Sequence, residues 1–265
     1  MRTATYRWVV GVLGVMVLGG VAGAQSAEPA CTVGVQSYSV YSAGGTHGGP
    51  YTATAKQSFE QRLPDGSYVR GSVRTHQARD SAGKTMSESE RGCQRDENGV
   101  PQPKFGVGVI DQTKRVSISW EIGVGADDVV RIFHMGDPPK PLTAEELAAQ
   151  RKRFAQQQPP RYSSKREDLG MRTIAGVDAH GSRVTQTIPA GAEGNELPLV
   201  IVSETWNSKE LGLILLGMRD DPRRGKTTFE IEELTQGEPD PTLFVPPAGY
   251  KIVDQNPPVD NATKP

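Results

Sequence analysis

The chain has 265 residues, with 30 Lys and Arg against 31 Asp and Glu, and a formal net charge of −1. Both signs of charge are interspersed, so the sequence shows no basic patch of the kind that binds nucleic acid. Its 30 glycines and 20 prolines lie mostly at turn-like places. This distribution favours many short strands over long helices.

Residues 1–24 have the pattern of a secretory signal peptide. Two arginines give a positive start, Trp8 to Leu18 form a short apolar core, and Ala22-Gly23-Ala24 is a small-x-small cleavage pattern. A membrane span needs about 20 apolar residues, and this run is shorter and rich in glycine. We therefore expect cleavage near Ala24/Gln25, a periplasmic or secreted protein, and no stable membrane span afterwards. A retained anchor is the alternative.

Strand patterns begin after an irregular lead-in over residues 25–50. The clearest alternation of apolar and polar residues is in the segment Arg115–Ile122. Two prolines among polar residues predict a loop over Cys93–Lys104. The strands predicted in this half are Tyr51–Leu63, Tyr68–Arg79, Lys84–Arg91, Phe105–Ile110, Arg115–Ile122 and Val129–Met135.

One helix is predicted in the middle of the chain. Thr143-Ala144-Glu145-Glu146 is a capping box, in which a Thr and a Glu three residues later satisfy each other's backbone N–H groups. The helix is expected over about 142–157, where Pro159-Pro160 ends it. It has few apolar residues, so we expect it either to pack a thin stripe on the sheet or to span between two halves of the fold.

The second half returns to strands. The segment Leu211–Met218 is apolar on both faces, so a strand there must be covered twice, by core on one side and by a helix or ligand on the other. The polar tail 254–265 is expected to be disordered, which leaves 51–253 as a single β-rich domain with the helix inserted. The remaining predicted strands are Arg166–Ala175, Val177–Ile188, Leu197–Trp206, Leu211–Met218 and Lys226–Thr235.

Two cysteines, Cys31 and Cys93, remain after signal cleavage. In an oxidising compartment the simplest interpretation is one disulfide between them. Such a bond would close a loop of about 60 residues and stabilise the fold by roughly 4 kcal/mol. A catalytic thiol is the alternative, but neither cysteine lies in a C-x-x-C pair or a recognisable nucleophile motif.

Several short motifs resemble a family of uncharacterised exported bacterial proteins. That family has an "LADG" hairpin, a "RDSxGRTR" turn, a Gly-rich "TIPaG..GN" block and an "E.W" strand. The matching segments here are Leu63-Pro64-Asp65-Gly66-Ser67, Arg79 to Thr85, Gly176 to Asn195, Ser203-Glu204-Thr205-Trp206, Asp221-Pro222-Arg223 and Leu243 to Tyr250. The match covers most of residues 50–253. The family has no assigned activity, so the resemblance assigns no catalytic residue.

More distantly, the run of hairpins closed by an "LF-x-x-P-x-G-Y" segment is similar to periplasmic lipoprotein carriers of the LolA/LolB type. That resemblance implies a curved antiparallel sheet, a half-barrel, around an apolar cavity. The fold class we expect is therefore mainly β, with one curved antiparallel sheet and one helix at about 142–157.

The sequence offers little catalytic chemistry. The four histidines, His47, His76, His134 and His180, have no metal-binding spacing. The Gly-rich run at 191–195 lacks the features of a phosphate loop, and no G-x-S-x-G elbow is present. We therefore expect no catalytic residue, metal or cofactor, and a protein that is not an enzyme.

Five apolar residues are candidates for lining a ligand pocket, with ordinary core as their alternative role: Trp120, Trp206, Leu213, Leu215 and Phe244. The preferred hypothesis is an envelope protein that binds an apolar or lipid-like ligand in the concavity of the sheet. The second is a structural or protein-interaction module whose partner is another envelope protein. The third is a hydrolase whose histidine and carboxylate converge in a cleft.

Overall fold

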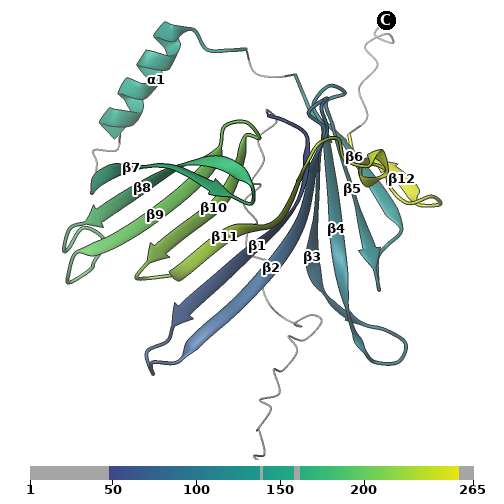
Figure 1. The fold of residues 1–265 in the computed structure, drawn as a ribbon, viewed down its shortest axis with the longest axis horizontal. Helices are drawn as coiled ribbons and strands as arrows, with labels where there is room; N and C mark the ends of the chain where they lie inside the picture. Colours follow the sequence, from purple (N-terminus) through teal and green to yellow (C-terminus); the bar gives the residue numbers. More distant parts are fainter. Residues whose placement is uncertain (1–47, 138–139, 158–161, 257–265) are drawn as a thin grey trace, which may run out of the picture.

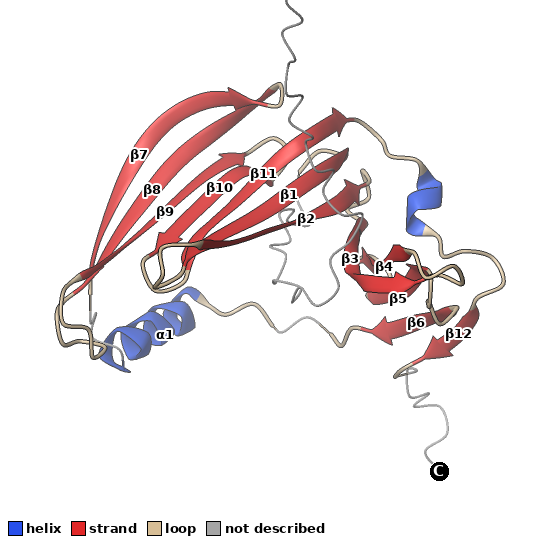
Figure 2. Ribbon diagram, turned by 90° about the horizontal axis from the view of Figure 1, so that it is seen from below, coloured by secondary structure: helices blue, strands red, loops and turns tan. Residues whose placement is uncertain are grey.

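The computed structural model describes residues 48–137, 140–157 and 162–256, and these form one large sheet and one α-helix. Figures 1 and 2 show that the sheet is curved and does not close into a barrel. The strands are β1 (Tyr51–Arg62), β2 (Tyr68–Arg79), β3 (Thr85–Arg95), β4 (Pro101–Asp111), β5 (Val116–Gly123), β6 (Val129–His134), β7 (Ser163–Ile174), β8 (Val177–Ile188), β9 (Leu199–Ser208), β10 (Leu213–Asp221), β11 (Gly225–Gln236) and β12 (Lys251–Asp254).

The strand order shows how the chain builds this sheet: β12-β6-β5-β4-β3-β2-β1-β11-β10-β9-β8-β7. The chain forms β1 to β6 as successive hairpin neighbours, crosses to the far edge, and returns through β7 to β11. The two runs join where β1 pairs with β11, from Tyr51 opposite Gln236 to Glu60 opposite Lys226. The curved antiparallel sheet with one helix that the sequence predicts is therefore confirmed.

The two edges of the sheet differ. The edge strand β7 has twelve residues and a bulge between Asp168 and Gly170, and four of its nine exposed residues are charged. Bulges and charges are common protections of an edge against pairing with other chains. At the other edge, the four-residue strand β12 runs parallel to β6, whereas all other pairs are antiparallel.

The predicted loop over Cys93–Lys104 is wrong, because β3 extends to Arg95 and β4 begins at Pro101. A tight turn joins them, in which the carboxylate of Asp96 accepts hydrogen bonds from the backbone N–H groups of Asn98 and Val100, each at 2.9 Å. Strand β5 pairs with β4 only from Lys104 onward. Pro101 and Pro103 of β4 therefore lie beyond the part that pairs with β5, where no backbone N–H is needed for a hydrogen bond to that strand. This is a usual position for proline in a sheet.

Helix α1 (Ala144–Gln157) confirms the helix prediction. Thr143 N donates to Glu146 Oε2 at 2.7 Å and Glu146 N to Thr143 Oγ1 at 3.2 Å, which is the expected capping box. The side chains of residues 144–154 are all exposed. Figures 1 and 2 show α1 standing apart from the sheet. Of the two placements considered, the packed stripe is not formed, and α1 lies on the connection between β6 and β7.

Two separate apolar clusters lie on the sheet. One gathers around β1 and β8 to β11, where the segment predicted to have two apolar faces contributes Leu211, just before β10, and Leu213 and Leu215 on β10, all at most 2% exposed. Its other buried members are Tyr51, Ala53, Ala55, Val177, Ala179, Trp206, Phe229 and Ile231. Along β10 the buried Leu213 and Leu215 alternate with the partly exposed Ile214 and Leu216, and the register against β9 shifts between Ile214 and Leu216. The second cluster belongs to β2 to β6.

Arg79, the last residue of β2, is buried at the join of the two runs, with 0% exposed area. Its guanidinium donates to the carbonyl oxygens of Gly49, before β1, and of Leu211, between β9 and β10. The guanidinium carbon also lies 4.9 Å from the ring centre of Tyr51. Gly48 is required here, because a Cβ on it would meet the Leu211 carbonyl oxygen at 2.3 Å, and its φ is +128°.

We expect Arg79→Leu to lower the free energy of unfolding by about 3 kcal/mol, because it leaves buried carbonyls without their donor. Arg74→Leu is the matched control: its side chain is exposed and pairs with Glu232 across 2.8 Å, so its loss should cost less than about 1 kcal/mol. Urea unfolding measures both. Equal costs for the two variants would contradict the structural role given to Arg79.

Candidate functional site

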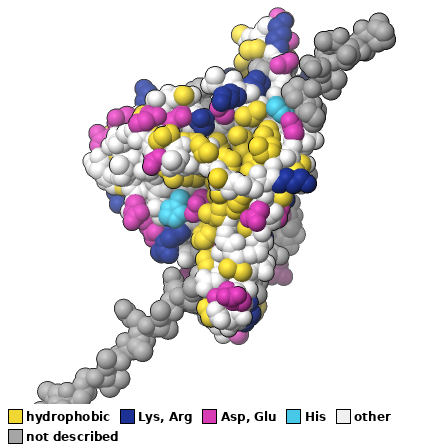
Figure 3. Space-filling model, turned by 90° about the vertical axis from the view of Figure 1, so that its right-hand side faces the viewer, with side chains coloured by type: hydrophobic (Ala, Val, Ile, Leu, Met, Phe, Trp, Pro, Cys, Tyr) yellow, Lys and Arg dark blue, Asp and Glu magenta, His cyan; other side chains and the backbone are white. Residues whose placement is uncertain are grey.

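The second apolar cluster forms a surface that we call the apolar face. Its buried members are Ala78, Met86, Val107, Val109, Trp120, Val130 and Phe244, with Ile118, Ile122, Ile132 and Tyr250 partly exposed beside them. The register places Val107 opposite Trp120 and Val109 opposite Ile118, so the side chains share one side of the sheet. Figure 3 shows apolar side chains gathered in a continuous area on this side of the molecule.

The apolar face is partly covered by the chain after β11. A short 3-10 helix, η1 (Pro241–Phe244), is capped by Asp240, which accepts from Thr242 N at 2.8 Å. Phe244 is buried on the face, and the Tyr250 hydroxyl donates to the Glu121 carbonyl at 3.0 Å. The family-like "LF-x-x-P-x-G-Y" motif therefore anchors this covering segment through its two aromatic residues.

Two apolar side chains that follow η1 in the chain are exposed to solvent. Val245 is 62% exposed and Ile252, on β12, is 66% exposed. Ile252 is in register with Val130, so it extends the apolar face to the edge of the sheet. An apolar surface that is only partly covered is typical of a site for a ligand or partner.

The five predicted pocket-lining residues divide between the two clusters. Trp120 and Phe244 belong to the apolar face, whereas Trp206, Leu213 and Leu215 belong to the cluster around β8 to β11. All five are buried. Their role in lining a ligand pocket remains a prediction. Since the five residues lie in two separate clusters, they cannot all line one pocket.

Trp206 is held by its neighbours on several sides. A Cβ on Gly181 would meet the indole ring at 2.7 Å, so the ring lies directly against that backbone. The indole Nε1 donates to Glu204 at 2.8 Å, and the Arg172 guanidinium lies 5.5 Å from the ring. The hydrogen bond from Trp206, followed by that from Arg183, lowers the pKa of Glu204. The "E.W" motif thus has a structural explanation.

The described histidines lie in three different places. His134 Nε2 is 2.8 Å from Asp254, His180 Nε2 is 2.9 Å from Asp168, and His76 Nδ1 is 3.2 Å from the Thr54 hydroxyl. His47 lies outside the described residues. Within the described part of the chain, no group of three or more His, Cys, Asp or Glu is arranged to hold a metal ion.

His180 also borders an open hollow of about 660 Å³. A histidine oriented by a carboxylate is one arrangement that serves general acid–base catalysis. The residues that line the hollow carry no hydroxyl or thiol nucleophile: they are Met171, Asp178, His180, Asn207, Lys209 and Glu210. In this hollow the histidine and carboxylate of the hydrolase hypothesis lie together without such a nucleophile.

Of the two cysteines in the predicted disulfide, Cys93 lies in the described part of the chain. Cys93 lies on β3 opposite Pro103, and no described cysteine is free. Cys31 lies outside the described residues, as do the predicted signal peptide and residues 257–265 of the predicted tail. Asp254, the first residue of that tail, is the last residue of β12. In the described ranges no helix is long and apolar enough to cross a membrane.

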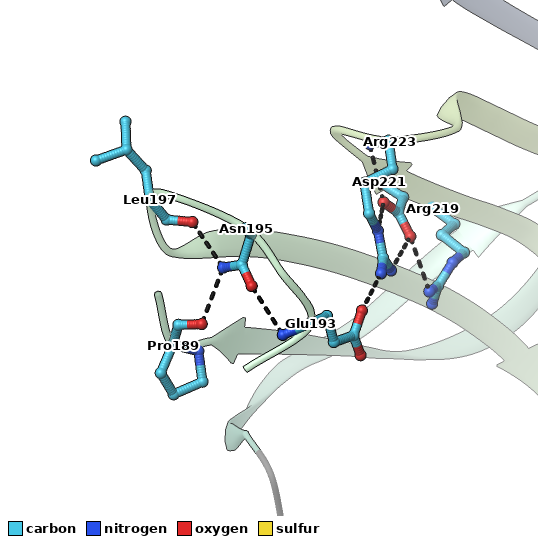
Figure 4. A network of polar contacts seen from close by, with 7 residues as sticks. All are labelled: Pro189, Glu193, Asn195, Leu197, Arg219, Asp221 and Arg223. Atoms are coloured by element: carbon cyan, nitrogen blue, oxygen red, sulfur yellow. Dashed lines mark hydrogen bonds and ion pairs between the residues drawn. The ribbon is translucent and has the colours of Figure 1, made fainter. Parts of the chain in front are cut away.

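A polar network ties the β8–β9 loop to the β10–β11 turn (Figure 4). The Asp221 carboxylate, 2% exposed, accepts from Arg223 Nε and Nη2 at 3.0 Å each, and Arg223 also pairs with Glu193. Asn195 holds the loop from inside, donating to the Pro189 and Leu197 carbonyls at 2.9 and 2.7 Å. The family-like motifs Gly176 to Asn195 and Asp221-Pro222-Arg223 meet here.

Comparison with known proteins gives structural neighbours alone. No protein-family model matches the chain, and no curated protein does. The MucA/MucB complex of Pseudomonas aeruginosa is similar at 16% identity and a TM-score of 0.37, over 78% of this chain and 59% of that chain. This chain spans about 60% of the length of the MucB chains that it matches.

Two further neighbours have lipoprotein-sorting or LolA descriptions. A putative outer membrane lipoprotein-sorting protein domain from Vibrio parahaemolyticus has 10% identity and a TM-score of 0.26, over 74% of this chain and 89% of that one. A LolA superfamily protein from Nitrosomonas europaea has 8% identity and a TM-score of 0.25, over 75% and 90%. Both descriptions are of the kind that the LolA-type resemblance implies, and no conclusion about family or function follows from them.

We predict an acid-dependent loss of stability at the Asp221 network. The hydrogen bond from Arg223 lowers the Asp221 pKa to about 2, from about 3.9 in an unfolded chain. A carboxyl group with a lowered pKa in the folded state stabilises it above pH 4 and loses that contribution as the pH falls from 4 to 2. The loss should amount to about 2 kcal/mol.

Asp221→Asn should remove this part of the pH dependence in urea unfolding between pH 2 and 5. Asp220→Asn, the exposed neighbouring residue, is the control and should leave the profile unchanged. A wild-type profile in the Asp221→Asn variant would show that the network does not hold a charged carboxylate.

Proposed function

We propose that this protein is an exported, non-enzymatic protein of the cell envelope that holds an apolar, lipid-like ligand against the apolar face. The observation that carries the proposal is the apolar surface over β3 to β6 and β12, which the described part of the chain covers only with residues 240–250. A sheet with one apolar side normally buries it against a second layer. Here an apolar ligand would supply the missing part of that layer.

The position of the ligand follows from the exposed apolar residues. Val245 and Ile252 are exposed, and Ile118, Ile122 and Ile132 are partly exposed members of the apolar face. Burying an apolar side chain of this size contributes about 1.5–3 kcal/mol. Micromolar affinity corresponds to about 8 kcal/mol, and the cost of association comes on top of that, so the ligand must bury several of these side chains at once. The apolar face therefore replaces the single concave pocket as the proposed binding place.

Saturable uptake of a fluorescent fatty acid by the purified protein tests this function. Val245→Lys combined with Ile252→Lys should weaken uptake by about tenfold or more, since each lysine places a charge at the border of the apolar face. Leu197→Lys is the matched control, because Leu197 is 75% exposed and lies in the β8–β9 loop.

Two results would contradict the proposal: no saturable uptake by the wild-type protein, or equal weakening by Leu197→Lys. Circular dichroism of both variants establishes that any loss of uptake arises in a folded protein.

A protein-interaction module is the second candidate, favoured by helix α1. Leu147 and Phe154 are 41% and 63% exposed and lie seven residues apart, hence on one side of the helix. Helices of about this length are marginal in water without packing. A partner protein that covers this side would stabilise α1.

A photo-crosslinking residue at position 154, used in the native envelope, should capture one protein reproducibly. The same residue at position 152 is the control, because two positions along a helix lie on nearly opposite sides. Leu147→Glu should abolish the product formed from position 154. Identical products from both positions, or no effect of Leu147→Glu, would exclude α1 as the contact.

A further inference from the structure

A row of three hydroxyl side chains crosses the middle of the sheet. The register places Ser58 on β1 opposite Thr228 on β11 and opposite Ser72 on β2. Side chains opposite each other in a sheet lie on the same side, with Cβ atoms about 5 Å apart. The three hydroxyls therefore form a continuous row at right angles to the strands.

Longer charged side chains stand on both sides of this row. Glu60, two residues further along β1, lies opposite Lys226 of β11 on one side and Arg70 of β2 on the other. Lys56, two residues earlier in β1, lies opposite Glu230 of β11 and Arg74 of β2. Since residues two apart in a strand share a face, the short hydroxyls form a floor between two charged ridges. We call this arrangement the hydroxyl trough.

The trough is a real depression in the surface. It contains a hollow of about 410 Å³, lined by Lys56, Ser58, Phe59, Glu60, Arg70, Gly71, Ser72, Lys226 and Thr228. Gly71 is paired with Phe59 on the other side of the sheet from the hydroxyls, where a Cβ on Gly71 would meet the Phe59 ring at 2.2 Å. On the hydroxyl side the floor is formed by the small side chains of Ser58, Ser72 and Thr228, which leave room for a ligand.

The charge of this hollow is positive. Three cations line it against one carboxylate, that of Glu60, which already accepts from Arg70 Nε at 2.6 Å. Lys56 is 3.7 Å from Glu232, outside the hollow. Lys226 has no carboxylate within 4.0 Å among the described residues. Its ammonium group remains available for an anion.

The floor also has unused hydrogen-bonding capacity. Ser58, Ser72 and Thr228 make no side-chain hydrogen bond to any described group of the protein. Each hydroxyl can donate one proton, and the Lys226 ammonium can donate three. Hydrogen bonds from such donors to an ionised oxygen are roughly twice as strong as those between neutral groups.

We propose that the hydroxyl trough binds an oxyanion of the phosphoryl class, with Lys226 and Arg70 neutralising its charge and the three hydroxyls donating to its oxygens. The proposal does not rest on the apolar ligand. The charged residues Arg74, Glu232 and His76 lie between the trough and the apolar face, and Arg74 pairs with Glu232 at 2.8 Å. The two sites can therefore fail or succeed separately.

Calorimetric titration of the whole protein with inorganic pyrophosphate at low ionic strength tests the site. We expect saturable binding that weakens as salt is added. Lys226→Gln removes the free charge and should weaken binding about tenfold. Ser58→Val places a branched side chain on the floor, suits a strand, and should weaken binding at unchanged net charge.

Lys209→Gln is the matched control, since Lys209 borders the other hollow, beside His180, and its loss should leave pyrophosphate binding unchanged. Fatty-acid uptake by Ser58→Val should also be unchanged, which separates a failure here from a failure of the apolar face. The proposal is overturned if the wild-type protein shows no saturable binding, or if Lys226→Gln and Ser58→Val bind as tightly as the wild type.

Vesicles identify the source of the oxyanion. Sedimentation with phosphatidylglycerol vesicles that depends on Lys226, with none for phosphatidylcholine vesicles, would support a lipid headgroup as the ligand. Binding of pyrophosphate without any binding to vesicles would support a soluble phosphorylated ligand.

Discussion

The buried guanidinium of Arg79 joins the two halves of this sheet. Removing a charged group from water is costly, and the structure offsets that cost with the carbonyl oxygens of Gly49 and Leu211 and the ring of Tyr51. These partners come from the chain that enters β1 and from the connection between β9 and β10. The two runs of strands are thereby held together as one curved sheet. The shapes of the apolar face and of the hydroxyl trough depend on this sheet.

Local patterns in the sequence were sufficient for most strands and for the helix. Alternation located the central strands to within a few residues, and the capping box located the start of α1. Two predictions from the sequence failed, the loop over Cys93–Lys104 and the absence of a strand at β12. Both failed because a strand's pairing partner can lie far away in the chain. The prolines of β4 are tolerated because β5 is too short to reach them, and β12 is a strand only because β6 accepts it in parallel.

The candidate sites were harder to predict than the fold. Trp120 and Trp206 both alternate within apolar strands, and nothing near either residue indicates that they belong to separate clusters. The hydroxyl trough was missed because its rows combine β11 with β1 and β2, and Ser58 and Thr228 are far apart in the chain. Only the register of distant strands brings these side chains together. Both motifs that form the Asp221 network were recognised in the sequence, but nothing in the sequence indicated that they contact each other.

The pairing of β1 with β11 has a consequence for how the molecule is made. Strands β1 to β6 can assemble from neighbouring hairpins as the chain emerges, and so can β7 to β11. Tyr51, however, finds Gln236 only when nearly the whole chain is present. Contacts between such distant residues form slowly because a long loop must close first. Until β11 is made, β1 has one edge without its partner strand, and an unpaired strand edge is a surface at which chains can aggregate.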